Sequence, residues 1–578
     1  MKTHFFILIL ALYSLQCISQ NVDIQLRQKV PMRDGINLSA DIYKPEDTSK
    51  PLPTILIYTP YLNDEAVDRG MFFAKAGYVF ISLDLRGRGN SEGTYFPFEK
   101  DGQDGHDAIN WIAQQPWSNG EVGMMGGSYR GMVQWFTLKE MPKALKTIIP
   151  TASVGPGLDF PKTNGVFYDY SLQWLTFTAG KGHNDEMFGN GAYWGNKSEK
   201  KIKEGLAFKD WDKITLNERN PIFQKWIAHP DFDAYWQNFY PQQEHYEKMN
   251  LPILTITGYF DADQPGAMKY YKDHMKYGNA NGKAQHYLVY GPWTHGGTRK
   301  PETAVGGLQF GNSAKIDMLQ LHLDWFNWTL KNGKKPKFLK NRVNHFVMER
   351  NEWMHSEDFY QLANDSLTFY LSSPESTATS LFDAGQLINT KPGKEAPDSY
   401  SFDPLDTTTQ VSTNTSDYYK VPIPGVLKNS LIYVSSPLKS DIELVGQAEL
   451  GAYISLNVRD TDINATYYEI RESGETIYLG TDILRARYRE SLEEATLAIP
   501  GEVALYRFKN SFFTHRKLLK SSRIAVHIEP LDPFSFQRNY NSGKDVSEET
   551  KADAVTAKVS LHHSKKYPSY LKLPVRRE

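Results

Sequence analysis

The sequence is almost without cysteine. Cys17 is the single cysteine among 578 residues, and it lies beside an N-terminal apolar stretch. If that stretch is cleaved off, the mature protein has no disulfide, no thiol nucleophile and no cysteine-ligated metal. A secreted protein without cysteine suits the bacterial periplasm or exterior, where an absent thiol cannot mispair.

A charge of one sign is also lacking. The 65 lysines and arginines nearly balance the 67 aspartates and glutamates. This balance gives no electrostatic reason to expect a nucleic-acid partner or attachment to an anionic membrane surface. No pair of metal ligands has the spacing H-E-x-x-H, so metal-dependent hydrolysis ranks last among the hydrolytic mechanisms, and we expect no metal and no cofactor.

Long apolar runs are absent except at the N-terminus. A short basic start precedes the apolar segment 5–15 (FFILILALYSL), and smaller residues follow it. This order is typical of a secretory signal peptide over 1–19, and the segment is shorter than the ~20 residues that span a bilayer. Bulky Gln16 disfavours a lipoprotein attached through Cys17. We therefore predict a secreted or periplasmic protein without a membrane span.

The first half of the mature chain alternates between strand and helix patterns. Strand candidates such as 54–61 (TILIYTPY) and 78–87 (YVFISLDLRG) are separated by helix candidates such as 105–115 (GHDAINWIAQQ). Such alternation predicts an α/β domain with a doubly wound parallel sheet. We assign 20–153 and 248–338 to this domain.

Two regions depart from this alternation. Residues 154–247 are rich in aromatic residues and helical stretches and have no strand rhythm, which predicts a helical cap inserted between two strands. Most of its aromatic residues are expected to pack in its core. Residues 339–578 carry short strands separated by turn residues, which predicts an all-β sandwich of the jelly-roll kind.

A glycine-rich turn raises the question of a nucleophile. In GMMGGSYRGM (123–132), Ser128 follows a strand candidate and precedes a helix candidate, with small neighbours on either side. A nucleophile elbow needs this strand–turn–helix context. The strict pattern G-x-S-x-G is not met, because Arg130 stands where the second glycine belongs. The motif alone therefore fits a structural turn as well as a catalytic serine.

Two further residues strengthen the catalytic interpretation. A serine hydroxyl is inert unless a base takes its proton. In α/β-hydrolases the acid and the histidine follow the serine in the chain, each after a strand. Here Asp261 ends the strand candidate LPILTITGYFD, and His295 ends QHYLVYGPWTH. Each alone is equally a turn aspartate or a loop histidine, but three residues in the required order favour a triad of Ser128, Asp261 and His295.

Longer motifs resemble a known family. The group comprises cocaine esterase, α-amino acid ester hydrolase and glutaryl-cephalosporanate acylase, and it is related to the X-Pro dipeptidyl-peptidases of the S15 class. The likeness covers nearly the whole mature chain and rests on DLRGRGNSEG (84–93), the stretch 104–131, GYFDAD (258–263), GPWTHGG (291–297) and DILRARYRE (482–490). It implies an α/β-hydrolase domain, a helical cap and a C-terminal jelly roll. The family pattern is G-x-S-Y-x-G, which Arg130 satisfies.

The resemblance assigns roles to the site residues. Ser128 becomes the nucleophile, His295 the general base and then acid, and Asp261 the residue that orients the imidazole. The resemblance also implies two oxyanion donors, the backbone N–H of Tyr129 and the hydroxyl of Tyr61 in YTPY. An aromatic packing role is the alternative for Tyr61.

The resemblance leaves the substrate open. Family members that read a free α-amino group use a carboxylate cluster, because a buried ammonium needs paired negative charge. Asp263 matches one of these carboxylates, Gln264 replaces another, and Asp159 is a loosely aligned third. Surface solvation explains Asp159 and Asp263 equally well. We expect a secreted serine hydrolase that works through an acyl-enzyme, of the α-amino-acyl or dipeptidyl type. A plain carboxylesterase or acylase is the alternative.

A non-catalytic carbohydrate-binding protein is the competing hypothesis from another class. Aromatic residues in 351–360 (NEWMHSEDFY) and 465–470 (ATYYEI) fit a sugar-binding sandwich. The joint presence of Ser128, Asp261, His295 and Tyr61 argues against it. The expected partner is a small ester, an amide or a short peptide, and a homo-oligomer is left open.

Overall fold

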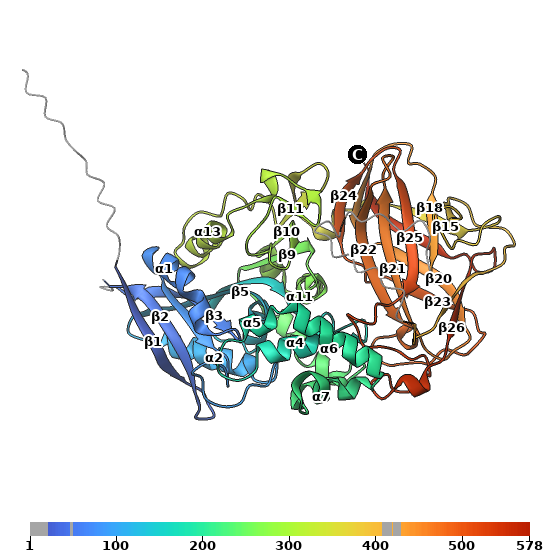
Figure 1. The fold of residues 1–578 in the computed structure, drawn as a ribbon. Helices are drawn as coiled ribbons and strands as arrows, with labels where there is room; N and C mark the ends of the chain where they lie inside the picture. Colours follow the sequence, from blue (N-terminus) through green and yellow to red (C-terminus); the bar gives the residue numbers. More distant parts are fainter. Residues whose placement is uncertain (1–20, 47–49, 407–418, 420–428, 578) are drawn as a thin grey trace, which may run out of the picture.

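The computed structural model describes residues 21–46, 50–406, 419 and 429–577. The signal peptide predicted over 1–19 lies outside the described residues. Figure 1 shows an α/β region, cap helices below it, and a separate all-β region that carries the C-terminus. Over the described ranges, every helix is too short or too polar to cross a membrane.

A large mixed sheet forms the centre of the N-terminal domain. In the described part of the chain it has ten strands in the order β1-β2-β4-β3-β5-β6-β9-β10-β13-β14. The strands from β4 to β13 pair in parallel, and the edge strands are antiparallel. Their bounds are β1 Val22–Pro31, β2 Asn37–Pro45, β3 Leu52–Thr59, β4 Val79–Asp84, β5 Ser118–Ser128, β6 Leu145–Ser153, β9 Ile253–Phe260, β10 His286–Thr294, β13 Val343–Val347 and β14 Glu352–Ser356. The predicted doubly wound sheet is confirmed.

Helices cover both faces of this sheet because alternate side chains of a strand point to opposite faces. In β3, Leu56 and Tyr58 pack with the helices α2 and α3, whereas Ile55 and Ile57 pack with α1 and α13. The helices are α1 Val67–Lys75, α2 Asp101–Ala113, α3 Tyr129–Lys139, α11 Gln264–Tyr277, α12 Ala280–Ala284 and α13 Met318–Leu330. Burial on both faces explains why the central strands read as continuous apolar runs.

The predicted helical cap lies between β6 and β9 in the chain. It consists of a short hairpin, β7 Lys162–Thr163 and β8 Val166–Phe167, and the helices α4 Tyr170–Phe177, α5 Asp185–Phe188, α6 Gly191–Glu204, α7 Trp211–Leu216, α8 Pro221–Ile227, α9 Ala234–Gln237 and α10 Gln243–Tyr246. Its tryptophans Trp174, Trp226 and Trp236 are buried in the same cluster as Tyr129 of α3. The cap is therefore packed onto the helix that follows the nucleophile strand.

The C-terminal domain is all-β. Its thirteen strands in the described residues are β15 Asp365–Ser372, β16 Gly385–Ile388, β17 Asp398–Phe402, β18 Leu431–Ser435, β19 Ile442–Gly446, β20 Glu449–Leu456, β21 Asp462–Ile470, β22 Thr476–Arg485, β23 Ala504–Phe508, β24 Thr514–Leu518, β25 Arg523–Pro530, β26 Ala557–His562 and β27 Tyr570–Arg576. Its main apolar core consists of its own residues, and a second buried cluster joins Val445, Ile477 and Phe513 to β9, β10 and α11 of the α/β domain. The all-β character is confirmed, and the jelly-roll topology stays a prediction.

The strand pairing differs from the predicted boundary at 338/339. The predicted sandwich, 339–578, includes the segment 341–350 (NRVNHFVMER). In the structure this segment contains β13, which pairs in parallel with β10, and β14 pairs with β13. The α/β sheet therefore extends to Ser356. The error arose because a short apolar strand looks the same in either sheet, and only its tertiary neighbour decides where it belongs.

The cap and the all-β domain are tied together by buried polar contacts. Arg485 forms a bidentate ion pair with Asp462 at 2.7 and 2.9 Å, and it also donates to the carbonyl of Gly165 in the cap hairpin at 3.2 Å. Asn164 donates to the carboxylate of Asp482 at 2.9 Å. The C-terminal domain is therefore bound to the cap hairpin through these buried polar contacts.

Candidate active site

Ser128 occupies a strained turn between β5 and α3. Its backbone has φ 66° and ψ −129°, a left-handed conformation that is uncommon for any residue except glycine. A β-carbon on Gly126 would lie 2.6 Å from the β-carbon of Arg130, and one on Gly131 would lie 2.5 Å from the carbonyl oxygen of Thr151. Both glycines are therefore required for the helix to approach the strands. The turn has the strain and the small neighbours of a nucleophile elbow.

The structure brings His295 and Asp261 together at one edge of the sheet. Asp261 follows β9 and His295 follows β10, and these strands are parallel neighbours, so their carboxyl ends meet. Nδ1 of His295 lies 2.8 Å from Oδ1 of Asp261. The carboxylate of Asp261 is fully buried and also accepts the backbone N–H of Asp263 at 3.0 Å. This contact fixes one ring nitrogen of the imidazole and leaves Nε2 on the opposite side of the ring.

Asp263 lies among these residues rather than apart from them. Its Oδ2 is 3.5 Å from Nδ1 of His295, and the Ser128 side chain is near enough to lower the pKa of Asp263. The pKa of Asp263 is raised to about 6, because burial and the charge of Asp261 raise it by more than His295 and Arg299 lower it. Asp263 is therefore a close neighbour of His295 and of Ser128, whereas the sequence predicted it only as a substrate contact.

The imidazole of His295 titrates above its usual range. Burial lowers the pKa of His295, but the nearby carboxylates of Asp263 and Asp261 raise it by more, so the net shift is upward. A histidine acts as a general base only when it is neutral. A base at this position would therefore lose its neutral form as the pH falls through a pKa that lies above the ordinary value of histidine.

Two donors point to the nucleophile. The side chain of Ser128 lies near enough to the Tyr61 hydroxyl to lower its pKa, and Nε1 of Trp174 donates to that hydroxyl at 3.4 Å. Burial raises the pKa of Tyr61, so its hydroxyl stays protonated and able to donate. The backbone N–H of Tyr129 stands at the first residue of α3, where helix N–H groups are free to bind an anion.

The side chain of Tyr129 has a structural part in the site. Its hydroxyl donates to Oδ2 of Asp101 at 2.5 Å and accepts the backbone N–H of Phe98 at 2.8 Å. Its ring is stacked on that of Trp174 from the cap, with centroids 5.7 Å apart. These contacts hold the backbone that follows Ser128, and Asp101 had no sequence signal that would have revealed this part.

The cap supplies one wall beside Tyr61. Phe177 of α4 stacks on the Tyr61 ring with centroids 5.5 Å apart, and the Arg130 guanidinium lies 5.2 Å from the centroid of the same ring. Nη1 of Arg130 is 3.4 Å from a carboxylate oxygen of Glu65. The sequence motifs gave Arg130 only a variable position in the family pattern, whereas in the structure it borders Tyr61, the proposed oxyanion donor.

Asp159 is buried close enough to Asp263 for the two charges to interact. Its carboxylate accepts the backbone N–H groups of Gly155 at 2.7 Å and Gly266 at 2.6 Å. Burial raises the pKa of Asp159 well above its usual value, and the charge of Asp263 adds to the rise. The side chain of Gln264 does not join these acids, because its Oε1 accepts the backbone N–H of Phe513 in the C-terminal domain at 2.7 Å. The predicted pair of acids is thus assembled without a third member from Gln264.

Comparison with known proteins agrees with this geometry. Residues 34–297 match the X-Pro dipeptidyl-peptidase (S15 family), and residues 336–572 match the X-Pro dipeptidyl-peptidase C-terminal non-catalytic domain. The cocaine esterase of Rhodococcus sp. (strain MB1 Bresler) is 26% identical, over 96% of this chain and 99% of its own.

Solved structures share the fold. An aminopeptidase from a marine sediment archaeon, Thaumarchaeota archaeon, has a TM-score of 0.82 at 21% identity and covers 96% of both chains. An α-amino acid ester hydrolase has a TM-score of 0.81 at 21% identity and covers 97% of both chains.

These findings define the class of the protein and then its family. The protein is a serine hydrolase with an α/β domain followed by an all-β domain. Within that class, the chain belongs to the X-Pro dipeptidyl-peptidase (S15) family. The family assignment decides against the non-catalytic carbohydrate-binding alternative.

Proposed function

We propose that this chain hydrolyses esters or amides of α-amino-acyl or dipeptidyl type through an acyl-enzyme on Ser128. One observation carries the proposal: His295, held at 2.8 Å by buried Asp261, shares Asp263 as a neighbour with a serine in a strained elbow. An imidazole oriented by a carboxylate beside a serine is the arrangement that activates a hydroxyl for acyl transfer.

The proposed reaction runs in two halves. His295 takes the proton of Ser128 as Oγ attacks the carbonyl carbon of the substrate, and the imidazolium formed is stabilised by Asp261. The negative charge on the carbonyl oxygen is met by the Tyr61 hydroxyl and the Tyr129 N–H. His295 then gives the proton to the leaving alcohol or amine. Water attacks the acyl-enzyme in the same way, which releases the acid and restores the Ser128 hydroxyl.

The acid pair supports recognition of a free amine. Asp159 and Asp263 both have raised pKa values because burial penalises their charged forms. A substrate ammonium between them would stabilise the charged carboxylates and so lower both pKa values, with release of protons on binding. The relatives named an aminopeptidase and an α-amino acid ester hydrolase fit this proposal. The relative named cocaine esterase, together with the orientation of Gln264, keeps a carboxylesterase without amine recognition as the second candidate.

A substrate panel decides between the two candidates. The kcat/KM of a free-amine dipeptide anilide is compared with that of its N-acetylated form and with that of a simple aryl ester. We expect N-acetylation to lower kcat/KM by at least about tenfold, and Asp159→Asn to remove this preference while leaving the aryl ester nearly unaffected. Asp273→Asn, an acid of α11 paired with Lys269, is the matched control. Equal rates for free and acetylated substrates would favour the plain esterase.

We further propose that the enzyme is secreted or periplasmic, because the pattern of residues 1–19 is typical of a signal peptide. Expression of the full chain in a bacterial host followed by N-terminal sequencing of the released protein tests this. A mature N-terminus shortly after residue 19 is expected, and an uncleaved chain retained in the cytoplasm would contradict it. A homo-oligomer stays a prediction.

A further inference from the structure

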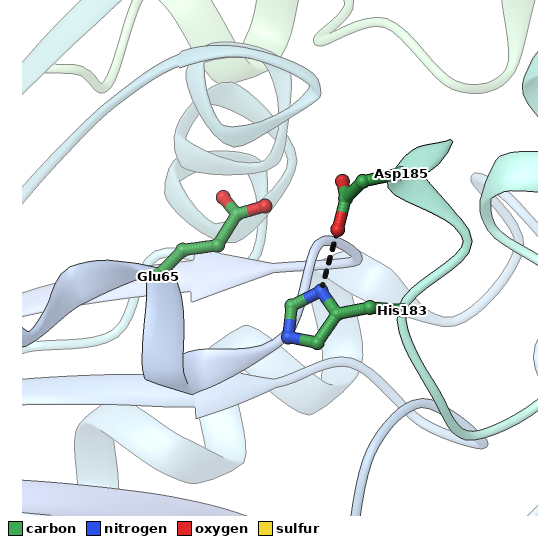
Figure 2. Close-up of side chains that lie close together, drawn as sticks. All are labelled: Glu65, His183 and Asp185. Carbon is green, nitrogen blue, oxygen red and sulfur yellow. Dashed lines mark ion pairs between the residues drawn. The ribbon is translucent and has the colours of Figure 1, made fainter. Parts of the chain in front are cut away.

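We propose that Glu65, His183 and Asp185 form a binding site for a divalent transition metal such as Zn²⁺, where the cap meets the α/β domain. Figure 2 shows the three side chains converging from two segments of the chain. One ligand atom from each residue lies within 4.8 Å of the other two. All three residues are exposed, so an ion reaches them directly from solvent.

The two segments come from different domains. Glu65 lies in the 3-10 helix Asn63–Ala66, shortly after Tyr61. His183 and Asp185 stand at the start of the cap helix α5. The cap segment is already docked on the α/β domain, since Arg88 donates to the carbonyl of Gly180 and Lys181 donates to the carbonyl of Ser91. The cluster therefore rests on two anchored pieces of backbone.

The spacing of the cap ligands fits a shared metal. With metal–ligand bonds of about 2.0–2.2 Å, two ligand atoms of a tetrahedral site are separated by roughly 3.3–3.5 Å. Nδ1 of His183 and Oδ2 of Asp185 are 3.3 Å apart. The cap also contains His229 and Asp233, whose atoms are 2.7 Å apart, an ordinary hydrogen-bond distance. In the described residues that second pair is not joined by a third metal-ligating side chain, so it serves as an internal contrast.

The donor set points to the kind of ion. One imidazole nitrogen and two carboxylates suit Zn²⁺ and similar transition metals, whereas Ca²⁺ and Mg²⁺ favour oxygen ligands alone. Three protein ligands leave a fourth position for water. Because the imidazole must be neutral to bind, affinity falls as the pH decreases.

An occupied site would act on the neighbouring catalytic residues. Glu65 lies 3.4 Å from Arg130, and the Arg130 guanidinium lies 5.2 Å from the Tyr61 ring. A metal bound to the Glu65 carboxylate would compete with Arg130 for that carboxylate. It would also hold the cap segment that carries His183 and Asp185 close to Glu65. We expect substrate KM to rise when the metal is bound. This effect on turnover rests on the proposed function, but binding of the metal does not.

Calorimetric titration of Zn²⁺ into the chelator-treated, purified full chain tests the site. We expect one Zn²⁺ per chain with a micromolar Kd at pH 7.5, at least about tenfold weaker binding for His183→Ala and for Glu65→Gln, and no change for His229→Ala. The catalytic residues Asp261, Asp263 and His295 also have ligand atoms within 4.8 Å of one another. A His295→Ala variant is therefore titrated in parallel and should keep the site.

Three results would overturn the proposal: no binding to the wild-type chain, equal binding by His183→Ala, or loss of binding in His295→Ala alone. X-ray absorption at the zinc edge adds a structural readout, with one imidazole and oxygen ligands expected for the wild type and the imidazole signal lost in His183→Ala. A KM unchanged by bound Zn²⁺ would refute the coupling to catalysis and leave the metal site itself standing.

Discussion

The catalytic edge of the sheet and the cap beside it are specified by the sequence in different ways. Ser128, Asp261 and His295 each follow a strand of one parallel sheet, so the order of the chain and the strand ends bring them to one edge. The cap residues around Tyr61, such as Phe177 and Trp174, are placed by aromatic packing between short helices. Topology thus places the three predicted triad residues, whereas tertiary packing places the residues around Tyr61.

The largest effect is expected at the catalytic edge. Asp261→Asn keeps the shape of the side chain but no longer holds and stabilises the charged imidazole of His295. We expect kcat for an aryl ester to fall by about 10⁴-fold with the thermal melting temperature nearly unchanged. A loss of less than tenfold would show that Asp263, at 3.5 Å from the same ring nitrogen, can serve as the orienting carboxylate instead.

On the cap side, the strongest expected effect is on stability. Arg485→Met leaves the buried carboxylate of Asp462 without its arginine and removes the contact to Gly165. Breaking a buried ion pair costs about 3–5 kcal/mol in the free energy of unfolding. Arg507→Met removes an exposed partner of Glu449 and should cost at most about 1 kcal/mol. Chemical denaturation measures both, and equal losses would contradict the account.

Tyr61 stands where the two regions meet. Tyr61→Phe removes the hydroxyl near Ser128 but keeps the ring between Phe177 of the cap and Arg130. We expect kcat to fall by about 10²–10³-fold with KM nearly unchanged, since the donor acts on charge that develops in the transition state. Tyr360→Phe, at an exposed tyrosine, is the control. A change in KM alone would assign Tyr61 to substrate packing.

The smallest expected effect is a shift in pH dependence. His295 has a raised pKa, so activity is present when it is deprotonated and is lost as the pH falls through that value. The acid limb of the wild type should lie above about pH 6.5, the ordinary value for histidine. Asp263→Asn removes a carboxylate that raises this pKa, so the limb should move to lower pH. Profiles of kcat/KM for an uncharged aryl ester test this, and a limb that stays or moves upward would contradict it.

The sequence predicted the α/β sheet, the helical insertion and the all-β C-terminal domain because these depend on periodicity. It predicted Ser128, Asp261 and His295 because their place at strand ends is visible in the chain. The strained backbone of Ser128 follows from its place in a sharp strand–turn–helix connection, and its φ of 66° agrees with that expectation. The sequence did not predict that β13 and β14 belong to the first sheet, because strand pairing depends on tertiary contacts rather than on local periodicity.

The acids near the site show the same limit. Asp263 carries the same sequence signal as any turn aspartate, yet its Oδ2 lies 3.5 Å from Nδ1 of His295 and its pKa is influenced by Ser128. Asp159 lies far from it in the chain, and their coupling depends on how the backbone around Gly155 and Gly266 folds over the carboxylate. The spacing of residues along the chain gives little information about side chains that act through a shared buried environment.

The most direct test of the account is covalent labelling of the nucleophile. A fluorophosphonate reacts with a serine only where a base and an oxyanion site activate it. Purified wild-type protein should gain one phosphonyl adduct that peptide mass spectrometry places on Ser128, and folded Ser128→Ala should gain none. An adduct on another residue, equal labelling of the variant, or no labelling of the wild type would contradict the claim that Ser128 is the nucleophile of a serine hydrolase.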